Sequence, residues 1–286
     1  MKKYKIIIDS SCDLVGNFAE ENDIYVTNLI INFGNESYID KIEINGDEII
    51  KKYNETKIFP KTSTLNIADL EKLLTSFLDE YEHVFYFTIS SKISSLYNNA
   101  KLAARKHSDR ITVIDSANLS GGFSMLMYKF VDLIKEGLSP KELEEEIEKY
   151  KSKAHIRFII DTLDFLHKGG RCSGMTNFVG RMLRVHPIVN TVDGKMVVEK
   201  VLPGKTINNC ISEFSDYFRN LVEKDRIDLE MPIIFSGYGF DPVIPKQIKE
   251  NLKDIISEDK FLSTTVSGII VCHCGPSTFG MGYMNK

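Results

Sequence analysis

The chain has no long hydrophobic run, although 43% of its 286 residues are hydrophobic. A membrane-spanning helix needs about 20 consecutive apolar residues. The apolar run nearest the N-terminus, residues 6–8, ends at Asp9. A run this short is typical of a first β-strand and not of a signal peptide. We therefore expect a globular protein that makes at most transient contact with a membrane.

Cysteine is also scarce, and its spacing lacks the regularity of a disulfide framework. The five cysteines are Cys12, Cys172, Cys210, Cys272 and Cys274. An odd number with such spacing in a chain of ordinary globular composition indicates free thiols. This favours a reduced, cytoplasmic location.

An excess of basic charge is missing as well. The formal net charge is −4, and acidic and basic residues are interspersed, so the sequence gives no support to a nucleic-acid partner. The chain contains neither a Walker phosphate loop nor a Gly-x-Ser-x-Gly nucleophile elbow. Kinase and hydrolase functions therefore lack their usual sequence signatures.

Short apolar runs alternate with helix-like segments through the first half of the chain. This alternation predicts an α/β protein whose first domain, residues 1–153, is a parallel sheet flanked by helices. The charged helix that starts at Ser139-Pro140 marks the boundary. We expect residues 154–286 to form a smaller α/β domain with a mixed sheet, containing a hairpin at Asp193-Gly194 and a last long strand at residues 266–272.

Serine and threonine follow several predicted strands. Hydroxyl-rich loops begin at Asp9-Ser10, Ser90-Ser91 and Asp115-Ser116. A single such residue is most often a helix cap. Several at one sheet edge, together with free helix N-terminal amides, would form a cradle for a carboxylate or a phosphate.

Two further motifs combine turn residues with polar side chains. Gly169-Gly170-Arg171 follows a predicted helix, and arginine is a good bidentate partner for a carboxylate. A helix stop with a surface arginine is the alternative. Cys272, His273 and Cys274 resemble metal ligands, but on a strand the two cysteines would face the side opposite His273. We expect no metal and no cofactor, and we expect His273 to donate to a ligand.

An apolar segment spans residues 123–130 and includes Phe123, Met125, Leu126, Met127 and Phe130. At helical spacing these residues are typical of a buried core. They would equally suit the wall of an apolar tunnel, so both interpretations stay open.

Taken in order, these motifs resemble the DegV family, whose members bind fatty acids. The resemblance covers nearly the whole chain. The segments that carry it are Ile8–Leu14, Thr62-Ser63-Thr64, Ile89–Ala100, Val113–Ser116, Asp161-Thr162-Leu163 with Lys168–Arg171, His186-Pro187-Ile188, and His273–Pro276 with Gly280.

The resemblance implies two α/β domains with a long-chain fatty acid held near their interface. By motif match, Thr62, Ser94 and His273 bind the carboxylate, and Arg171, Ser63 and Gly170 lie near the headgroup. It further implies a non-catalytic carrier that presents the fatty acid to a separate ATP-dependent fatty acid kinase. The acyl phosphate made by the kinase feeds bacterial phospholipid synthesis.

The chain departs from the family pattern at several positions. Ser95-Leu96 replaces Gly-Thr, His186 replaces lysine, Cys274 replaces threonine, and Thr64-Leu65 replaces Gln-Pro. Chain-length preference is therefore open. The alternative function is a hydrolase or acyltransferase acting on lipid esters, with Ser94 as nucleophile, His273 as base and a carboxylate such as Asp115.

Overall fold

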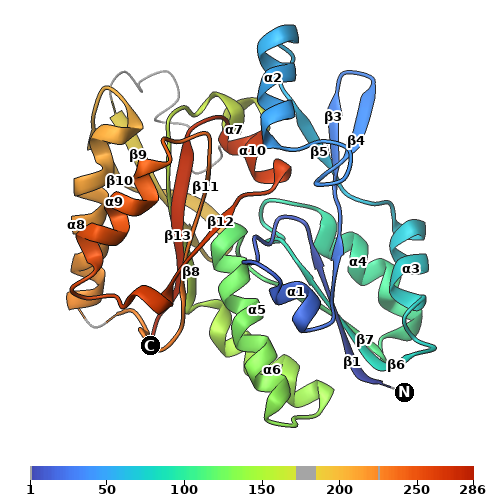
Figure 1. The fold of residues 1–286 in the computed structure, drawn as a ribbon. Coiled ribbons are helices and arrows are strands. Elements are labelled where there is room, and N and C mark those ends of the chain that lie inside the picture. Colours follow the sequence, from blue (N-terminus) through green and yellow to red (C-terminus); the bar gives the residue numbers. More distant parts are fainter. Residues whose placement is uncertain (1, 172–184, 225) are drawn as a thin grey trace.

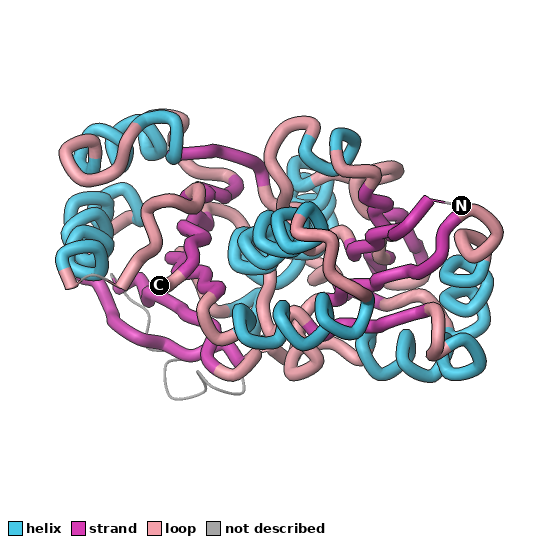
Figure 2. The backbone as a smooth tube through the Cα atoms, turned by 90° about the horizontal axis from the view of Figure 1, so that it is seen from below, coloured by secondary structure: helices cyan, strands magenta, loops and turns pink. Residues whose placement is uncertain are grey.

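The computed structural model describes residues 2–171, 185–224 and 226–286. Its strands form two separate sheets side by side and one smaller sheet above them (Figure 1). Seen from below, helices lie between the two large sheets and at both outer ends of the molecule (Figure 2). The predicted α/β architecture, with a parallel sheet and a separate mixed sheet, is confirmed.

The first sheet is parallel, in the order β2-β1-β6-β7. Its strands are β1 (Lys2–Asp9), β2 (Ile24–Thr27), β6 (Tyr81–Thr88) and β7 (Ile111–Asp115). The helices of this half are α1 (Phe18–Glu21), α3 (Ile67–Thr75), α4 (Leu96–Ala104), α5 (Ser120–Lys135) and α6 (Pro140–Lys151). Ser139 and Glu142 form a capping box at the start of α6, which confirms the helix predicted at Ser139-Pro140.

A small antiparallel sheet, in the order β4-β3-β5, projects from the first half together with one helix. These elements are β3 (Ile30–Phe33), β4 (Glu36–Ile39), β5 (Lys61–Ser63) and α2 (Gly46–Thr56). In the register of this sheet Thr62 pairs with Ile31. The pairing fixes the segment that carries Thr62, which matters for the site described below.

The second large sheet is mixed, in the order β10-β9-β8-β13-β11-β12. Its strands are β8 (Ala154–Ile160), β9 (Val185–Val192), β10 (Lys195–Pro203), β11 (Ile233–Tyr238), β12 (Phe261–Thr265) and β13 (Thr278–Met284), and its helices are α7 (Asp164–Lys168), α8 (Ile211–Glu223), α9 (Val243–Leu252) and α10 (Gly268–Cys274). Asp193 and Gly194 both have positive φ, of 49° and 77°, as the predicted hairpin turn requires.

The C-terminal region differs from its prediction. Residues 266–272 are not a strand: Gly268–Cys274 form α10, and the last strand is β13. The β-branched run Ile269-Ile270-Val271 favours a strand locally. However, the side chain of Ser267 caps the helix, and the amide of Gly268 donates to Asp40 Oδ1 at 2.9 Å. Because Asp40 is distant in sequence, a local pattern does not reveal this cap.

The two large sheets share a buried core. One hydrophobic cluster contains Ile7 of β1, Phe158 of β8 and Val271 of α10. Helix α5 packs against β8, β11 and β13, and α10 packs against β3 and β5. All strands of the parallel sheet end before residue 154, and the first strand of the mixed sheet, β8, begins at residue 154. The division into residues 1–153 and 154–286 stays a prediction.

The apolar segment at residues 123–130 forms the buried face of α5. Phe123, Met125, Leu126, Met127 and Phe130 all belong to a hydrophobic cluster beneath the parallel sheet. None of them lines the cavity described below. They are core residues in this structure, and the tunnel interpretation stays a prediction. The sequence also predicts a helix that follows Arg171 and ends at about Arg184, and this segment lies outside the described residues.

Candidate functional site

A cavity of about 290 Å³ is lined by β5, by the loop between β6 and α4, and by α7 and α10. Its volume is near the lower end of the range for ligand pockets, about 300–1,000 Å³. The polar residues that line it are Thr62, Ser63, Thr64, Ser94, Ser95, Arg171 and His273. The apolar ones are Leu29, Ile89, Ile93, Leu119, Leu166, Met196, Ile269 and Ile270, with Cys274.

Thr62 and His273 meet at one side of the cavity. Thr62 Oγ1 lies 2.8 Å from His273 Nε2, which is hydrogen-bond distance. The two residues come from β5 and from the last turn of α10. They are far apart in sequence, and the packing of α10 against β5 brings them together.

The imidazole of His273 is neutral. Burial, and to a lesser extent the positive charge of Arg171, lowers the pKa of His273 to about 3. Its Nδ1 is buried and has no hydrogen-bond partner among the described residues. A Cβ atom at Gly169 would lie 2.4 Å from this Nδ1. Glycine at position 169 therefore lets the backbone approach the histidine ring.

The Gly169-Gly170-Arg171 motif ends α7 in a Schellman arrangement. The amide of Gly170 donates to the carbonyl of His167 at 3.0 Å, and the amide of Arg171 donates to the carbonyl of Leu166 at 2.9 Å. Gly170 has a φ of 71°, which a residue with a side chain rarely adopts. The motif is therefore a helix stop, but Arg171 is partly buried and lines the cavity, so it is not a surface arginine.

The guanidinium of Arg171 connects both halves of the molecule. Nε donates to the carbonyl of Ile93 at 3.2 Å, and Nη1 donates to the carbonyl of Gly169 at 2.6 Å. Arginine has five N–H donors, so three remain after these two bonds. Among the described residues no carboxylate pairs with Arg171, and burial lowers its pKa. A partly buried cation without a protein counter-ion is well suited to hold an anionic ligand.

Ser94 faces the cavity from the loop before α4. Its amide donates to the carbonyl of Ser90 at 3.1 Å, and its Oγ accepts from the amide of Leu96 at 3.2 Å. The hydroxyl proton has no acceptor among the described residues. Ser94 can therefore donate to a ligand while its lone pair holds the turn.

Most other hydroxyls at this sheet edge are occupied by the protein itself. Asp9 accepts from the amide and hydroxyl of Ser11 and from the amide of Ile89. Ser10 Oγ accepts from the amide of Leu29, and Ser116 Oγ accepts from the amide of Asn118. The predicted loops do converge at this edge of the sheet. However, Asp9-Ser10 and Asp115-Ser116 stabilise the loops through hydrogen bonds within the protein and do not line the cavity.

The structure brings five of the six predicted site residues to one cavity. Thr62, Ser63, Ser94, Arg171 and His273 all line it. Ser63 is exposed and accepts from Asn32 at 3.1 Å, so it sits at the rim. The sixth residue, Gly170, instead lines an adjoining cavity together with Arg171.

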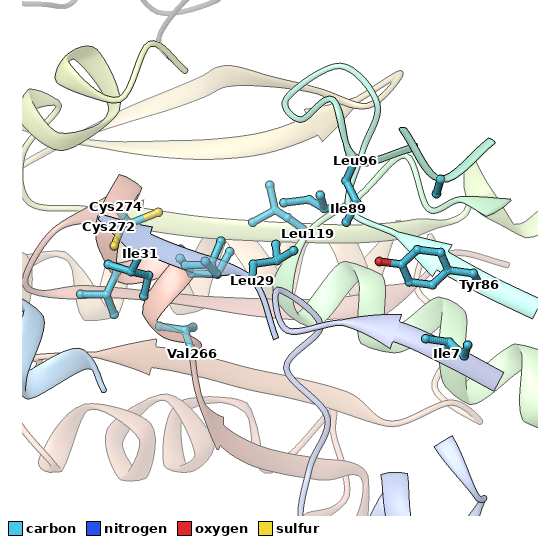
Figure 3. Close-up of a cluster of buried hydrophobic side chains, with 14 of the residues drawn as sticks. Ile7, Leu29, Ile31, Tyr86, Ile89, Leu96, Leu119, Val266, Cys272 and Cys274 are labelled. Carbon is cyan, nitrogen blue, oxygen red and sulfur yellow. The ribbon is translucent and has the colours of Figure 1, made fainter. Parts of the chain in front are cut away.

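The apolar part of the lining belongs to the core cluster shared by the two large sheets. Leu29, Ile89 and Leu119 lie close to one another at the centre of Figure 3. The sequence did not identify these residues as part of a ligand cavity, because they come from separate loops and strand ends. A narrow void beyond Leu119 and Ile270 reaches Phe158 of the mixed sheet. The apolar lining therefore extends from the polar corner toward the second sheet.

Three properties of the described residues bear on other kinds of site. No group of three His, Cys, Asp or Glu side chains is arranged to hold a metal ion there. Cys12, Cys210, Cys272 and Cys274 are free, buried thiols. Within the same residues, no helix is long and apolar enough to cross a membrane.

The fold and the site define an α/β protein with two large sheets, a partly apolar cavity and a cationic, hydroxyl-rich corner. The profile of the DegV family, described as uncharacterised proteins, matches residues 3–286. A DegV domain-containing protein of Clostridium perfringens is 30% identical over the full length of both chains. This chain belongs to the DegV family.

Solved structures share the fold over nearly the whole chain. A DegV family protein from Thermus thermophilus, described by its fatty acid binding, is 26% identical, covers 99% of this chain and 100% of its own, and has a TM-score of 0.88. The Streptococcus pneumoniae Fatty Acid Kinase (Fak) B3 protein, loaded with linoleic acid, is 22% identical, with 99% and 100% coverage and a TM-score of 0.81. The recognised family is confirmed.

Proposed function

We propose that this protein binds a long-chain fatty acid, with the carboxylate at Thr62 and Ser94, with His273 behind Thr62 and with Arg171 beside the carboxylate. The observation that carries this proposal is the polar corner itself. A partly buried guanidinium, which has no carboxylate partner among the described residues, lies on the same cavity as the hydroxyls of Ser94 and Thr62. The Ser94 hydroxyl accepts from the amide of Leu96 and keeps its proton for a ligand, and the Thr62 hydroxyl pairs with His273. The fatty acid binding described for the Thermus thermophilus relative supports the same ligand class.

The hydrogen bond between Thr62 and His273 decides whether the threonine hydroxyl can donate to a ligand. If the neutral imidazole carries its proton on Nε2, it donates to Thr62 Oγ1, and the threonine hydroxyl is free to donate into the cavity. The other tautomer would accept the threonine proton and turn lone pairs toward the ligand. A bound carboxylate therefore selects the Nε2–H tautomer, and His273 acts on the ligand through Thr62.

The acyl chain accounts for most of the expected affinity. Burial of each methylene contributes about 0.8 kcal/mol, so about sixteen carbons contribute roughly 13 kcal/mol before ordering costs. Leu29, Ile89 and Leu119 belong to the apolar lining of the same cavity. The buried carboxylate is compensated by the charge-assisted hydrogen bonds of that corner.

The partner is a separate fatty acid kinase that supplies ATP and forms the acyl phosphate for phospholipid synthesis. The Fak B3 protein supports this partnership through its shared fold. In this role the protein is a non-catalytic cytoplasmic subunit that makes at most transient contact with a membrane and binds no nucleic acid. It positions the carboxylate and does not itself carry out the ATP chemistry.

The alternative hydrolase is not supported by the geometry. His273 Nε2 is paired with Thr62 and not with Ser94. Asp115 Oδ1 accepts from the amides of Ser91 and Ala117, so it does not orient the histidine. A serine nucleophile needs a base within hydrogen-bond reach and a third group that orients the base.

Mass spectrometry of an organic extract of the purified protein tests the ligand. We expect a long-chain fatty acid at about one per chain, and no release of product from lipid esters. A delipidated sample should regain thermal stability when palmitate is added. An extract without lipid, together with no stabilisation by any fatty acid, would contradict the proposal.

A further inference from the structure

A second cavity, of about 180 Å³, adjoins the first at Arg171. It is lined by Lys92, Ile93, Gly170, Arg171, Lys195 and Met196. Ile93, Arg171 and Met196 also line the larger cavity. The guanidinium therefore lies at the junction of the two cavities, and the second cavity begins where the polar corner of the first one ends.

The hairpin turn that precedes Lys195 packs against the loop that carries Lys92. Ser90 Oγ donates to the carbonyl of Gly194 at 2.7 Å. A Cβ atom at Gly194 would lie 2.5 Å from Ser90 Oγ and 3.1 Å from Lys92 Cγ. Lys195, which follows this turn, is thus held near Lys92 by packing between the two halves of the molecule.

The second cavity is cationic without a counter-ion. Among the described residues, neither Lys92 nor Lys195 forms an ion pair or a side-chain hydrogen bond, and no carboxylate belongs to the lining. Asp193, in the same hairpin turn, lines a different cavity beside His155. Two exposed lysines and one partly buried arginine therefore line one small cavity.

The ligand that suits such a space carries more negative charge than a carboxylate, and it must reach past Arg171. We propose that the Lys92–Arg171–Lys195 cavity binds the phosphate group of an acyl phosphate, a proposal that rests on the function proposed above. In the kinase reaction a carboxylate oxygen forms a bond to the terminal phosphorus of ATP. The bond from that phosphorus to the β–γ bridging oxygen breaks, and ADP leaves. The new phosphate lies one oxygen beyond the carboxyl carbon, on the side of Arg171.

The test compares two ligands on one double variant, Lys92→Gln with Lys195→Gln. The probes are palmitate and a hydrolysis-resistant acyl phosphonate analogue of palmitoyl phosphate, titrated calorimetrically into delipidated protein. We expect the affinity for palmitate to stay within about twofold and the affinity for the analogue to fall about tenfold, because only the phosphonate reaches the lysines. The matched control, Lys101→Gln with Lys205→Gln, removes the same charge from two exposed positions that line neither cavity.

The outcomes separate this proposal from the fatty-acid proposal. If neither probe binds the wild-type protein, the proposed function fails. If palmitate binds and the lysine variant loses no affinity for the analogue, only the phosphate site is wrong. Inorganic phosphate is also titrated into the palmitate-loaded protein. If its binding free energy equals the difference in binding free energy between the analogue and palmitate, the cavity is a site for free phosphate. Weaker kinase binding with unchanged analogue affinity would instead make the lysines a protein-docking surface.

Discussion

Two serine-rich loops follow neighbouring strands of the parallel sheet, yet they do different things. The loop after β1, Asp9-Ser10-Ser11, is fully buried, and its side chains bond to the protein. The loop after β6 carries Ser94, which is partly exposed to a cavity and keeps a hydroxyl proton free to donate. The residue type alone does not distinguish a hydroxyl that stabilises the loop from one that binds a ligand. What differs is whether the hydrogen-bonding capacity of each group is already used.

The largest expected effect is on stability and falls on the first loop. Asp9→Ala removes the acceptor for the amides of Ser11 and Ile89 and leaves both donors buried. We expect a loss of about 3 kcal/mol in the free energy of unfolding, measured by chemical denaturation. Ser94→Ala, in the second loop, removes one acceptor for the amide of Leu96 and should cost only about 1 kcal/mol. Equal losses in the two variants would erase the distinction between the loops.

The next effect is on binding and falls on the second loop. Thr62→Val with Ser94→Ala removes two donors to the carboxylate and keeps the shape of the cavity. Because hydrogen bonds to charged groups are each worth about 1.5 to 3 kcal/mol, we expect the affinity for palmitate to fall at least about a hundredfold. Thr62→Ser is the matched control, since it keeps the hydroxyl. Undiminished affinity in the double variant would show that the headgroup assignment is wrong.

A smaller effect concerns pH. Burial lowers the pKa of His273 to about 3, whereas an unfolded histidine titrates near 6.5. Below pH 6.5 the unfolded state therefore binds a proton that the folded state does not, and stability falls as the pH decreases toward 3. Because His273 is partly exposed, we expect the free energy of unfolding to fall by about 2 to 3 kcal/mol between pH 7 and pH 4.

His273→Gln provides the comparison for this pH effect. The variant keeps an amide that can donate to Thr62 but has no titrating ring, so its stability should depend less on pH over the same range. Denaturation curves of both proteins at pH 7, 5.5 and 4 measure the difference. If the stabilities of the two proteins change equally with pH, the low pKa of His273 is not the cause of the pH dependence.

Several local features could be predicted from the sequence. The capping box at Ser139, the hairpin turn at Asp193-Gly194 and the turn at Gly169-Gly170 all depend on residues adjacent in the chain. Backbone preferences of proline, glycine and capping residues act over a few positions, so such features are visible in the sequence.

The helix that carries His273 could not be predicted in the same way. The run Ile269-Ile270-Val271 favours a strand, and a distant carboxylate, Asp40, helps to cap it as a helix. The strands β12 and β13 were missed for a related reason. Their positions depend on pairing with β11 and β8 across the mixed sheet.

The sequence by itself determined the alternation of strands and helices, the turn chemistry and the ordered motifs of the DegV family. Only the tertiary structure decided which polar groups share a cavity. It placed Thr62 against His273, brought Arg171 to the carbonyl of Ile93, and seated the hairpin turn on Ser90. These contacts join residues that are distant in the chain, and they form only when burial of the shared apolar core brings the two sheets together.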